Sequence, residues 1–433
     1  MATTTSFEQI VNLGRETVKT TFEYIGETEA PLYKHFTRKK AMRLTEQGYR
    51  MPILTRKPGG HTSYNRSNVN FREPVAPESD SMRTYPAWYA LPFKVDGSTL
   101  RDLKSGDANQ FLSYENYMRL ITEAAMKRLN YFFHGDGTGA LAVCTSVLTG
   151  TGSATLNLQS LASSAAGEAE TKGSVRLEVN QEYCIMNAST NAIKLIFTVT
   201  AILSKTSVTA NVTTFTANTA SGDPIVDAGA TTSLSAYKKA PEGLRSLAAN
   251  SGILQNVARA DYTELKTPRV NGSDNPVNPY MFRQAKDLVR VAANDTMKGS
   301  NKLCVITPGQ QGALCNQQFG LRRYEGNETV RGVASKFVDD DGDNILVDAD
   351  GAEDRIYFLD DSSYKIGEQK SFGMFDEDGN QIRMLAGTNS SGSDAFAGSI
   401  GWGGNMIKDG LPKTDVYLDR LSQTDVTQQI SLP

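Results

Sequence analysis

The sequence predicts an α+β protein that carries a separate small all-β domain. Three patterns lead to this prediction: a long amphipathic helical segment at 112–134, a run of alternating strands over 149–236, and mixed helices and strands after Pro241. A chain of 433 residues can form several packed units, because domains usually contain roughly 100 to 200 residues.

Residues 1–45 are predicted to form an N-terminal arm with a short helix. Ser6 and Gln9 make a capping-box pattern. Apolar residues then recur at helical spacing: Phe7, Ile10, Val11, Val18 and Phe22. A basic stretch follows, made of Lys34, His35, Arg38, Lys39, Lys40 and Arg43. Such a stretch is typical of a solvated or subunit-contacting face, with contact to DNA phosphates as the alternative.

Residues 46–100 are predicted to form a long β-hairpin arm. Pro58, Gly59 and Gly60 give a turn signal. Apolar residues alternate later in the segment, at Tyr89, Leu91, Phe93 and Val95. Polar residues fill 63–70, so the hairpin cannot bury both of its faces within its own domain. We therefore expect the arm to lean on a neighbouring subunit.

The segment 112–134 gives the strongest helical signal in the chain. Ser113 is positioned to cap it. One apolar stripe consists of Tyr117, Met118, Ile121, Ala125, Leu129 and Phe132. On the opposite face the charge changes sign every four residues, at Glu115, Arg119, Glu123 and Lys127. The helix is therefore expected to be half buried along its whole length, within a domain at 101–148.

A glycine-rich turn, Gly135-Asp136-Gly137-Thr138-Gly139, ends this helix. Glycine permits positive φ, so the turn can redirect the chain sharply. The turn lacks the Lys-Ser/Thr pair of a nucleotide-binding loop and follows a helix where those loops follow a strand. We interpret it as a structural joint between the helix and the next domain.

After the turn, Thr, Ser, Ala and Val dominate 149–236, where strands recur at short intervals and predict a compact barrel or sandwich. Residues 237–381 then show a mixed pattern. Helices are predicted at 279–297 and after Thr307-Pro308, with strands at 303–306, 344–347 and 355–359. Residues 382–433 include a Gly/Ser-rich stretch and a polar tail.

Composition excludes several classes of protein. The 45 basic and 48 acidic residues give a net charge of -3, which argues against tight nucleic-acid binding. The start of the chain does not resemble a secretory signal, and no apolar run approaches the roughly 20 residues that a membrane helix needs. The scattered cysteines Cys144, Cys184, Cys304 and Cys315 are predicted to be buried free thiols in a reducing compartment.

Candidate ligand sites are weak, and we predict no catalytic, cofactor-binding or metal-binding residues. The acidic run at 339–343, with Asp348 and Asp350, resembles a calcium loop, but its glycine is misplaced and a solvated turn is favoured. Residues 376–380 form a second acidic turn, in which Asp378-Gly379 is a hairpin signal. None of the three histidines, His35, His61 and His134, has a carboxylate at a spacing that indicates a catalytic base or metal site.

The segment 133–142, FHGDGTGALA, resembles a recurrent pattern of the major capsid proteins of tailed bacteriophages, a fold shared with encapsulins. The resemblance covers 92–142 most specifically, and extends to 242–247 and 278–364. It implies that 112–134 is a spine helix in a peripheral domain, that 46–100 is an extended arm, and that 237–381 is an axial domain. Residues 382–433 would complete the peripheral domain, with 149–236 as an inserted domain.

This resemblance implies a structural protein without enzymatic activity. Its copies would form hexamers and pentamers of an icosahedral head shell that encloses packaged phage DNA, assembled in the bacterial host cytoplasm. A separate scaffolding protein, a portal protein and a decoration or cement protein are the implied partners, with weak contact to double-stranded DNA and none to membrane. Lys57 could donate a crosslink, although a plain surface lysine is favoured. The alternatives are an encapsulin-like compartment shell and, further off, a secreted β-rich hydrolase.

Overall fold

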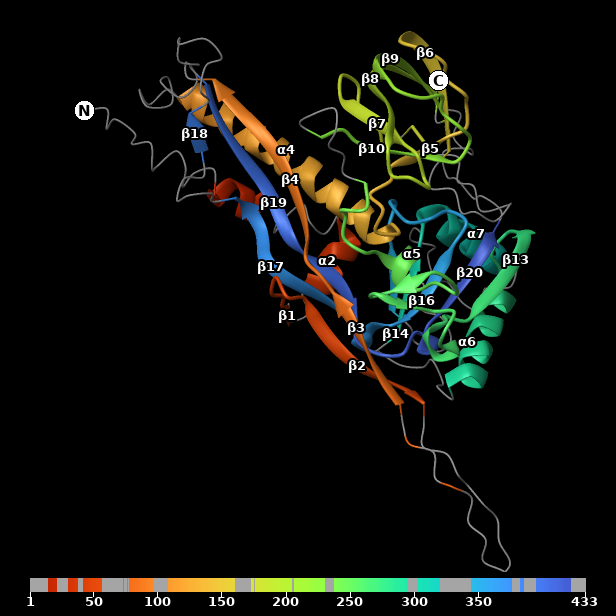
Figure 1. Ribbon diagram of the computed structural model, residues 1–433. Helices are drawn as coiled ribbons and strands as arrows, with labels where there is room; N and C mark the ends of the chain where they lie inside the picture. Colours follow the sequence, from red (N-terminus) through yellow and green to blue (C-terminus); the bar gives the residue numbers. More distant parts are fainter. Residues whose placement is uncertain are drawn as a thin grey trace, which may run out of the picture.

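Two five-stranded sheets, a closed barrel and one long helix organise the described part of the chain in a computed structural model (Figure 1). The described residues are 15–21, 30–37, 42–56, 73, 76, 78–96, 108–159, 173–174, 176–204, 206–229, 237–293, 302–319, 344–375, 382–384 and 395–421. The barrel stands apart from the two sheets, and the long helix ends beneath it (Figure 1). The predicted α+β class with an all-β unit is confirmed.

The long helix is α4 (Ala108–His134), which begins earlier than predicted, so Ser113 lies inside the helix and does not cap it. The apolar stripe is confirmed by buried Met118, Ala125, Leu129 and Phe132 and by half-buried Ile121. Tyr117 departs from the stripe, because it is 39% exposed and its hydroxyl donates to the Lys94 carbonyl at 3.1 Å. On the opposite face Glu115, Arg119 and Lys127 are exposed and Glu123 is half-buried.

The first five-stranded sheet is centred on β19 (Ala395–Lys408). Its neighbours are β17 (Tyr364–Met374), β18 (Ile382–Met384) and β4 (Ala87–Asp96), all antiparallel to it, while β1 (Met42–Arg43) pairs in parallel with β17. Helix α4 packs on β4 and β19, where Phe93, Val95, Met118 and Ile400 form one buried cluster. Burial of this apolar surface fixes β4 in the sheet.

The hairpin prediction was wrong for its second strand. The hairpin consists of β2 (Tyr49–Arg56) paired antiparallel with β3 (Glu78–Thr84). The alternating segment at 89–95 instead belongs to β4, where Tyr89 lies opposite Trp402 of β19. A two-stranded arm would leave these apolar residues in water, whereas the sheet buries them. The turn signal at 58–60, and Lys57, lie outside the described residues.

The described N-terminal segments pack against the chain itself. Residues 15–21 are helical and bury Val18. Helix α2 (Pro31–Thr37) buries Leu32, Tyr33 and Phe36 in the largest core cluster. Part of the predicted arm at 1–45 is thus core, because its apolar residues face α4 and β17. Within the basic stretch, His35 lies 3.0 Å from Asp361, and 38–40 lie outside the described residues.

The predicted β-rich domain is a closed barrel with the strand order β10-β5-β6-β9-β8-β7. Its strands are β5 (Ala142–Cys144), β6 (Gly152–Gln159), β7 (Glu182–Met186), β8 (Ile193–Ser204), β9 (Ser207–Phe215) and β10 (Asp223–Asp227). The alternation of its strands fills the interior with Leu156, Ile185, Phe197, Val208 and other buried residues. The barrel begins at β5, earlier than the boundary predicted at 148/149.

The second five-stranded sheet has the order β13-β20-β16-β14-β15. Its strands are β13 (Arg269–Asn275), β14 (Lys302–Ile306), β15 (Asn344–Val347), β16 (Ile356–Asp360) and β20 (Val416–Leu421). Helices α6 (Pro279–Ala293) and α7 (Pro308–Phe319) lie where helices were predicted. Strand pairing does not follow the predicted boundary at 381/382, because β17 belongs to the first sheet and β20 to the second.

A buried polar group connects the two sheets. Lys408 Nζ at the end of β19 lies 2.7 Å from Asp415 Oδ2, and both side chains are fully buried. The Tyr364 hydroxyl donates to the same oxygen at 2.8 Å. Short elements complete the described chain: α5 (Leu244–Leu247), β11 (Ile253–Leu254), β12 (Val257–Ala258), η1 (Thr263–Leu265), η2 (Asp361–Ser363) and η3 (Pro412–Thr414).

Three of the four cysteines, Cys144, Cys184 and Cys304, are free and buried as predicted. The side chain of Cys315 lies outside the described part. Across the described residues, no helix combines the length and apolar character that crossing a bilayer requires.

Candidate functional site

The last turn of α4 lies between two hydrophobic cores. Phe133 stacks on Tyr33 at a centroid distance of 5.4 Å and meets Trp402 edge-on at 5.4 Å, within the main core. Tyr131 and Phe132 face the opposite way and pack into the barrel core. This end of the helix therefore holds the barrel and the two-sheet body in contact with each other.

The glycine turn redirects the chain as predicted. Gly137 and Gly139 have φ of 81° and 75°, a region that favours glycine because a side chain would be strained there. The Thr138 N–H donates to Asp136 Oδ1 at 2.9 Å, and the Gly135 N–H donates to the Phe132 carbonyl at 3.0 Å. Local hydrogen bonds thus close the helix end and fix the direction in which β5 departs.

A second segment, 238–247, packs directly on this turn. The Arg245 N–H donates to the Gly135 carbonyl at 3.2 Å, and the Lys238 N–H donates to the Thr138 carbonyl at 2.7 Å. At Gly243, an added Cβ would lie 2.5 Å from the carbonyl oxygens of Phe132 and Phe133. The two short motifs at 133–142 and 242–247 therefore meet in space. We call this contact the joint.

Buried polar side chains reinforce the joint from the other side. Asn130 Nδ2 donates to Asp348 Oδ2 and to Asp350 Oδ2, each at 2.9 Å. His134 Nε2 lies 2.9 Å from Asp348 Oδ2, with both side chains almost fully buried. Burial would raise the pKa of Asp348, but His134 and the hydrogen bonds lower it below its ordinary value. Burial and the Asp348 charge raise the pKa of Asp350.

These contacts correct one prediction and add what another could not see. Asp348 was expected in a solvated turn and is instead buried beneath α4. No histidine has a carboxylate at an indicative spacing in the sequence, but in the structure His35 meets Asp361 and His134 meets Asp348. These pairs are separated by 326 and 214 residues, so spacing in the sequence gave no signal. His61 and the acidic runs 339–343 and 376–380 lie outside the described residues, among which no three His, Cys, Asp or Glu side chains could hold a metal ion.

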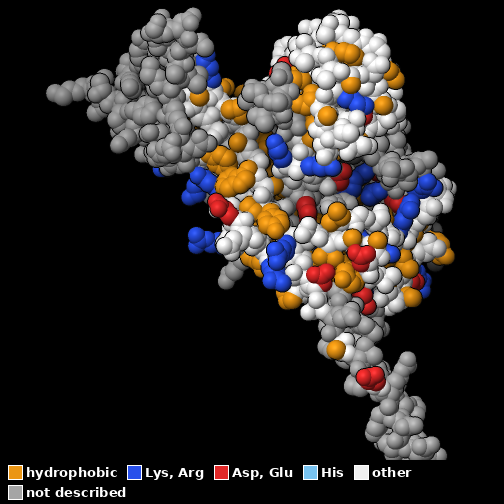
Figure 2. Space-filling model, viewed as in Figure 1, with side chains coloured by type: hydrophobic (Ala, Val, Ile, Leu, Met, Phe, Trp, Pro, Cys, Tyr) orange, Lys and Arg blue, Asp and Glu red, His pale blue; other side chains and the backbone are white. Residues whose placement is uncertain are grey.

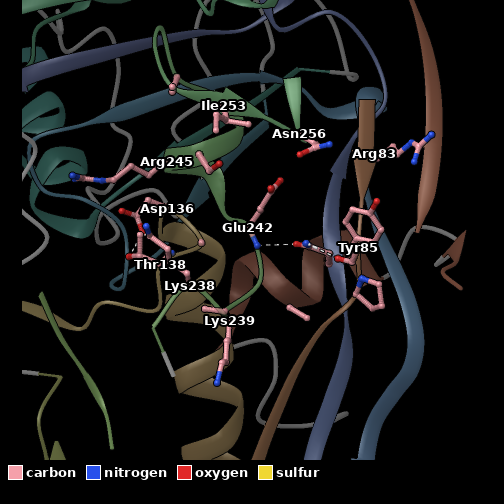
Figure 3. A pocket seen from close by; sticks show the side chains of 18 of the residues that line it. Arg83, Tyr85, Asp136, Thr138, Lys238, Lys239, Glu242, Arg245, Ile253 and Asn256 are labelled. Carbon is pink, nitrogen blue, oxygen red and sulfur yellow. Dashed lines mark hydrogen bonds between the residues drawn. The ribbon is translucent and has the colours of Figure 1, made fainter. Parts of the chain in front are cut away.

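A groove of about 970 Å³ opens between the joint and the start of β4 (Figure 3). The Glu242 side chain points into it, near Asn256 and Tyr85 (Figure 3). Burial raises the pKa of Glu242 to about 7, although the nearby Arg259 charge opposes this rise. Sequence analysis did not single out Glu242, although it precedes Gly243 in a segment that carried the resemblance.

Arg259 shapes the groove from below. Its guanidinium is buried, and burial lowers its pKa to about 10. It donates five hydrogen bonds of 2.6–3.2 Å to backbone carbonyls, those of Ser246, Leu247, Ser251, Ile253 and Leu265. One side chain thereby holds the loops around α5 and β11 in place, and with them the wall of the groove.

Solved capsid structures are similar to this chain over most of its length. A chain of the cyanophage A-1(L) capsid asymmetric unit matches with a TM-score of 0.51 and 9% identity, covering 91% of this chain and 93% of that chain. The chain has the fold of a phage capsid protein. Two others, from the capsid of a native GTA particle and from Mycobacterium phage Patience, both have a TM-score of 0.42, with 11% and 9% identity. They cover 89% and 98% of this chain, and 89% and 92% of theirs. No family model and no curated protein matches the sequence.

Within this phage-capsid fold, β4 presents a row of exposed, mostly apolar side chains on one face of the β4–β19 pair, beside Phe375, which packs edge-on against Trp88. Trp88, Ala90 and Pro92 point outward from β4 and are exposed. The Trp88 ring lies over Gly403, where an added Cβ would approach it to 2.6 Å. Figure 2 shows hydrophobic side chains gathered over these strands. A sheet face toward water is usually polar, so this face has the character of a protein interface.

Proposed function

We propose that the chain is the major capsid protein of a tailed phage, whose copies associate as hexamers and pentamers into an icosahedral head shell around packaged DNA. The observation that carries the proposal is the phage-capsid fold, matched over 91% of this chain at a TM-score of 0.51. The exposed apolar side chains of β4, Trp88, Ala90 and Pro92, support it, because shell subunits must present such surfaces to their neighbours. Its role is structural and not enzymatic.

The β2–β3 hairpin supports a clasping role. Its base is buried at Met51, Ile53 and Met82, but the two strands pair only with each other within the described chain and point away from the body (Figure 1). Arms of this kind let one subunit hold several neighbours. Many weak contacts then add to a stable lattice, because later contacts form at high effective concentration.

The proposal includes partners and a location. A separate scaffolding protein, a portal protein and a decoration or cement protein would act with the shell, which assembles in the host cytoplasm and persists in the virion. The domain layout carries over as well, with α4 as the spine helix of a peripheral domain, the second sheet in an axial domain and the barrel as an insertion. A net charge of -3 suits weak contact with DNA, because strong phosphate affinity would impede DNA movement during packaging.

Negative-stain microscopy and sedimentation velocity of the whole chain, alone and with its scaffolding protein, test the proposal. We expect closed shells that cryo-microscopy resolves into pentamers and hexamers. Uniform monomers under every assembly condition would contradict it. Shells purified from producing cells should protect double-stranded DNA from nuclease, whereas enclosed protein cargo without DNA would favour an encapsulin-like compartment.

A further inference from the structure

The groove at the joint contains a carboxyl group to which the subunit supplies no hydrogen-bond donor. Glu242 Oε2 is buried and accepts no hydrogen bond from any described residue, while the side chain as a whole is half-buried and lines the groove. Its backbone is fixed, because the Glu242 N–H donates to Asn405 Oδ1 at 2.7 Å. An ionised carboxylate is unfavourable in this position, whereas a protonated carboxyl group offers the groove an O–H donor.

Basic residues outnumber acidic residues around this carboxyl group. The charged residues that line the groove are Arg83, Lys238, Lys239, Arg245 and Arg259 against Asp136 and Glu242. Some of them are engaged within the subunit: Arg259 donates to backbone carbonyls, and Arg245 lies 3.6 Å from Asp354. Asp136 Oδ1 accepts a hydrogen bond from the Thr138 N–H. The excess of positive charge therefore rests on the remaining three cations.

These three cations, Arg83, Lys238 and Lys239, are exposed and have no carboxylate partner among the described residues. Arg83 lies on one side of Glu242, and the two lysines lie on the other (Figure 3). Arg83 also lies directly opposite the exposed Arg50 across the hairpin. Because like charges in this arrangement repel each other, the rim of the groove favours a negatively charged ligand.

The walls of the groove favour a polypeptide over a nucleic acid as that ligand. Tyr85, Trp88 and Ile253 line it and are 49%, 52% and 65% exposed. Ile253, the most exposed of them, has no ring on which a base could stack, but it suits an apolar side chain of a peptide. A carboxylate of a peptide can also share a proton with Glu242, because two carboxyl groups at one site do not both ionise readily. A phosphodiester, which stays ionised, cannot share a proton in this way.

We propose that this groove binds an acidic segment of a partner protein, with a carboxylate of that segment accepting a hydrogen bond from protonated Glu242. The three unpaired cations attract the segment, and the apolar walls contact its neighbouring side chains. A hydrogen bond from a hydroxyl group to a carboxylate is short and strong, because the acceptor is charged. One subunit contains the whole groove, so the proposal does not depend on shell formation.

Binding should be linked to the protonation of Glu242. Burial raises the pKa of this carboxyl group to about 7, although the Arg259 charge opposes the rise. Because only the protonated form donates a hydrogen bond, the affinity should fall about tenfold as pH rises from about 6 to about 8, in proportion to the protonated fraction. Glutamine at this position stays neutral across the range, and its amide can donate in place of the carboxyl group.

Fluorescence anisotropy tests the proposal on whole subunits kept below the concentration at which they assemble. The probe is a short labelled peptide of glutamate and leucine residues. We expect the wild type to bind it about tenfold more weakly at pH 8 than at pH 6, and Glu242→Gln to bind it equally at both. At pH 8 this variant should therefore bind about tenfold more tightly than the wild type. The matched control Glu115→Gln removes an exposed carboxylate on α4 and should behave as the wild type does.

A second variant tests the rim of the groove. Arg83→Gln should weaken binding about threefold at either pH, because an exposed ion pair contributes little, and it should remain folded, since it removes a repulsion with Arg50. Its control is Arg283→Gln, an exposed arginine on α6.

Two further probes decide the chemistry of the ligand. The same peptide with glutamine in place of glutamate should bind poorly and without pH dependence, and a single-stranded oligonucleotide should bind more weakly than the glutamate peptide. The proposal is overturned if the glutamate peptide does not bind, if the wild type binds it equally at pH 6 and pH 8, or if either of the other probes binds as tightly. Circular dichroism at both pH values establishes that each variant is folded. Failure of the wild type to form shells would contradict the capsid function and leave this binding result unchanged.

Discussion

At the joint, Tyr131, Phe132, Phe133 and His134 are all buried by segments of the same chain, whereas the buried hydrophobic residues described on the β2–β3 hairpin lie at its base. Two cores meet at the joint, and a buried polar cluster fixes it from below. Of the hairpin's described side chains, Met51, Ile53 and Met82 are buried in the main core and Tyr49 packs against it.

We infer from this difference that the joint determines the stability of one subunit, whereas the hairpin determines how subunits assemble. Changes at the joint should act on the stability of one subunit, because its contacts are complete within one chain. Changes on the outer surface of the hairpin should leave the subunit folded and act on contacts between copies. Four substitutions test this separation, and their expected effects on stability decrease in order.

Gly243→Ala should have the largest effect. Its Cβ would lie 2.5 Å from two carbonyl oxygens of α4, and backbone atoms cannot move aside cheaply, so we expect a loss of about 3 kcal/mol in unfolding free energy. Urea denaturation measures the loss. Gly373→Ala is the control, because an added Cβ there meets nothing within 4 Å. Equal stability of the two variants would show that the helix end is not tightly held.

Asp348→Ala should follow. It removes the oxygen that accepts a hydrogen bond from Asn130 Nδ2 and lies 2.9 Å from His134 Nε2. Because buried polar atoms are then left with fewer partners, we expect the unfolding free energy to fall by about 2 kcal/mol. The pKa of Asp348 is lowered in the fold, so its contribution is present above its unfolded pKa and disappears as pH falls through the folded pKa. The destabilisation should therefore shrink in acid. A pH-independent loss would mean that the carboxylate charge is not involved.

Glu242→Gln should change stability in the opposite direction. The fold raises the pKa of Glu242 from 4.5 to about 7. Between these two pH values Glu242 is ionised in the unfolded chain but still protonated in the folded one, so the unfolding free energy of the wild type falls as pH rises from about 4.5 through about 7. Glutamine avoids this penalty. The variant should gain on the order of 2 kcal/mol over the wild type by pH 8 and nothing at pH 4. Thermal unfolding across this pH range, with Glu115→Gln as control, measures the difference.

Local patterns predicted the elements of the joint but not its contacts. The helix, the glycine turn and the strand at 344–347 depend on spacing within a few residues, and the structure places them close to the predicted bounds. His134 lies within hydrogen-bonding distance of Asp348, and Phe133 stacks on Tyr33. A single sequence contains no signal for pairs so far apart along the chain. Glu242 was missed for the same reason, because its burial and raised pKa depend on the groove that distant segments form around it.

The second strand of the hairpin was mispredicted because alternation of apolar and polar residues indicates a strand but does not show which other strand it pairs with. The alternation at 89–95 is equally suited to an arm and to a sheet edge, and only the length of β19, whose residues 395–404 pair with 87–96, decides between them. The barrel, by contrast, takes all its strands from one continuous stretch, 142–227, and pairs them with one another. Its composition was therefore sufficient to predict a barrel or sandwich.

Arg50→Glu should have the smallest effect on stability and a clear effect on assembly. Arg50 lies directly opposite Arg83 across the hairpin, and both are exposed. Like charges in this position repel, so the substitution should stabilise the subunit by less than about 1 kcal/mol. Two facing arginines destabilise the lone subunit slightly, so we infer that they serve contact with another molecule. We therefore expect fewer shells at equal subunit concentration by sedimentation velocity, with Arg283→Glu on α6 as the exposed control. Normal shell yield together with greater stability would show that the outer surface of the hairpin plays no part in assembly.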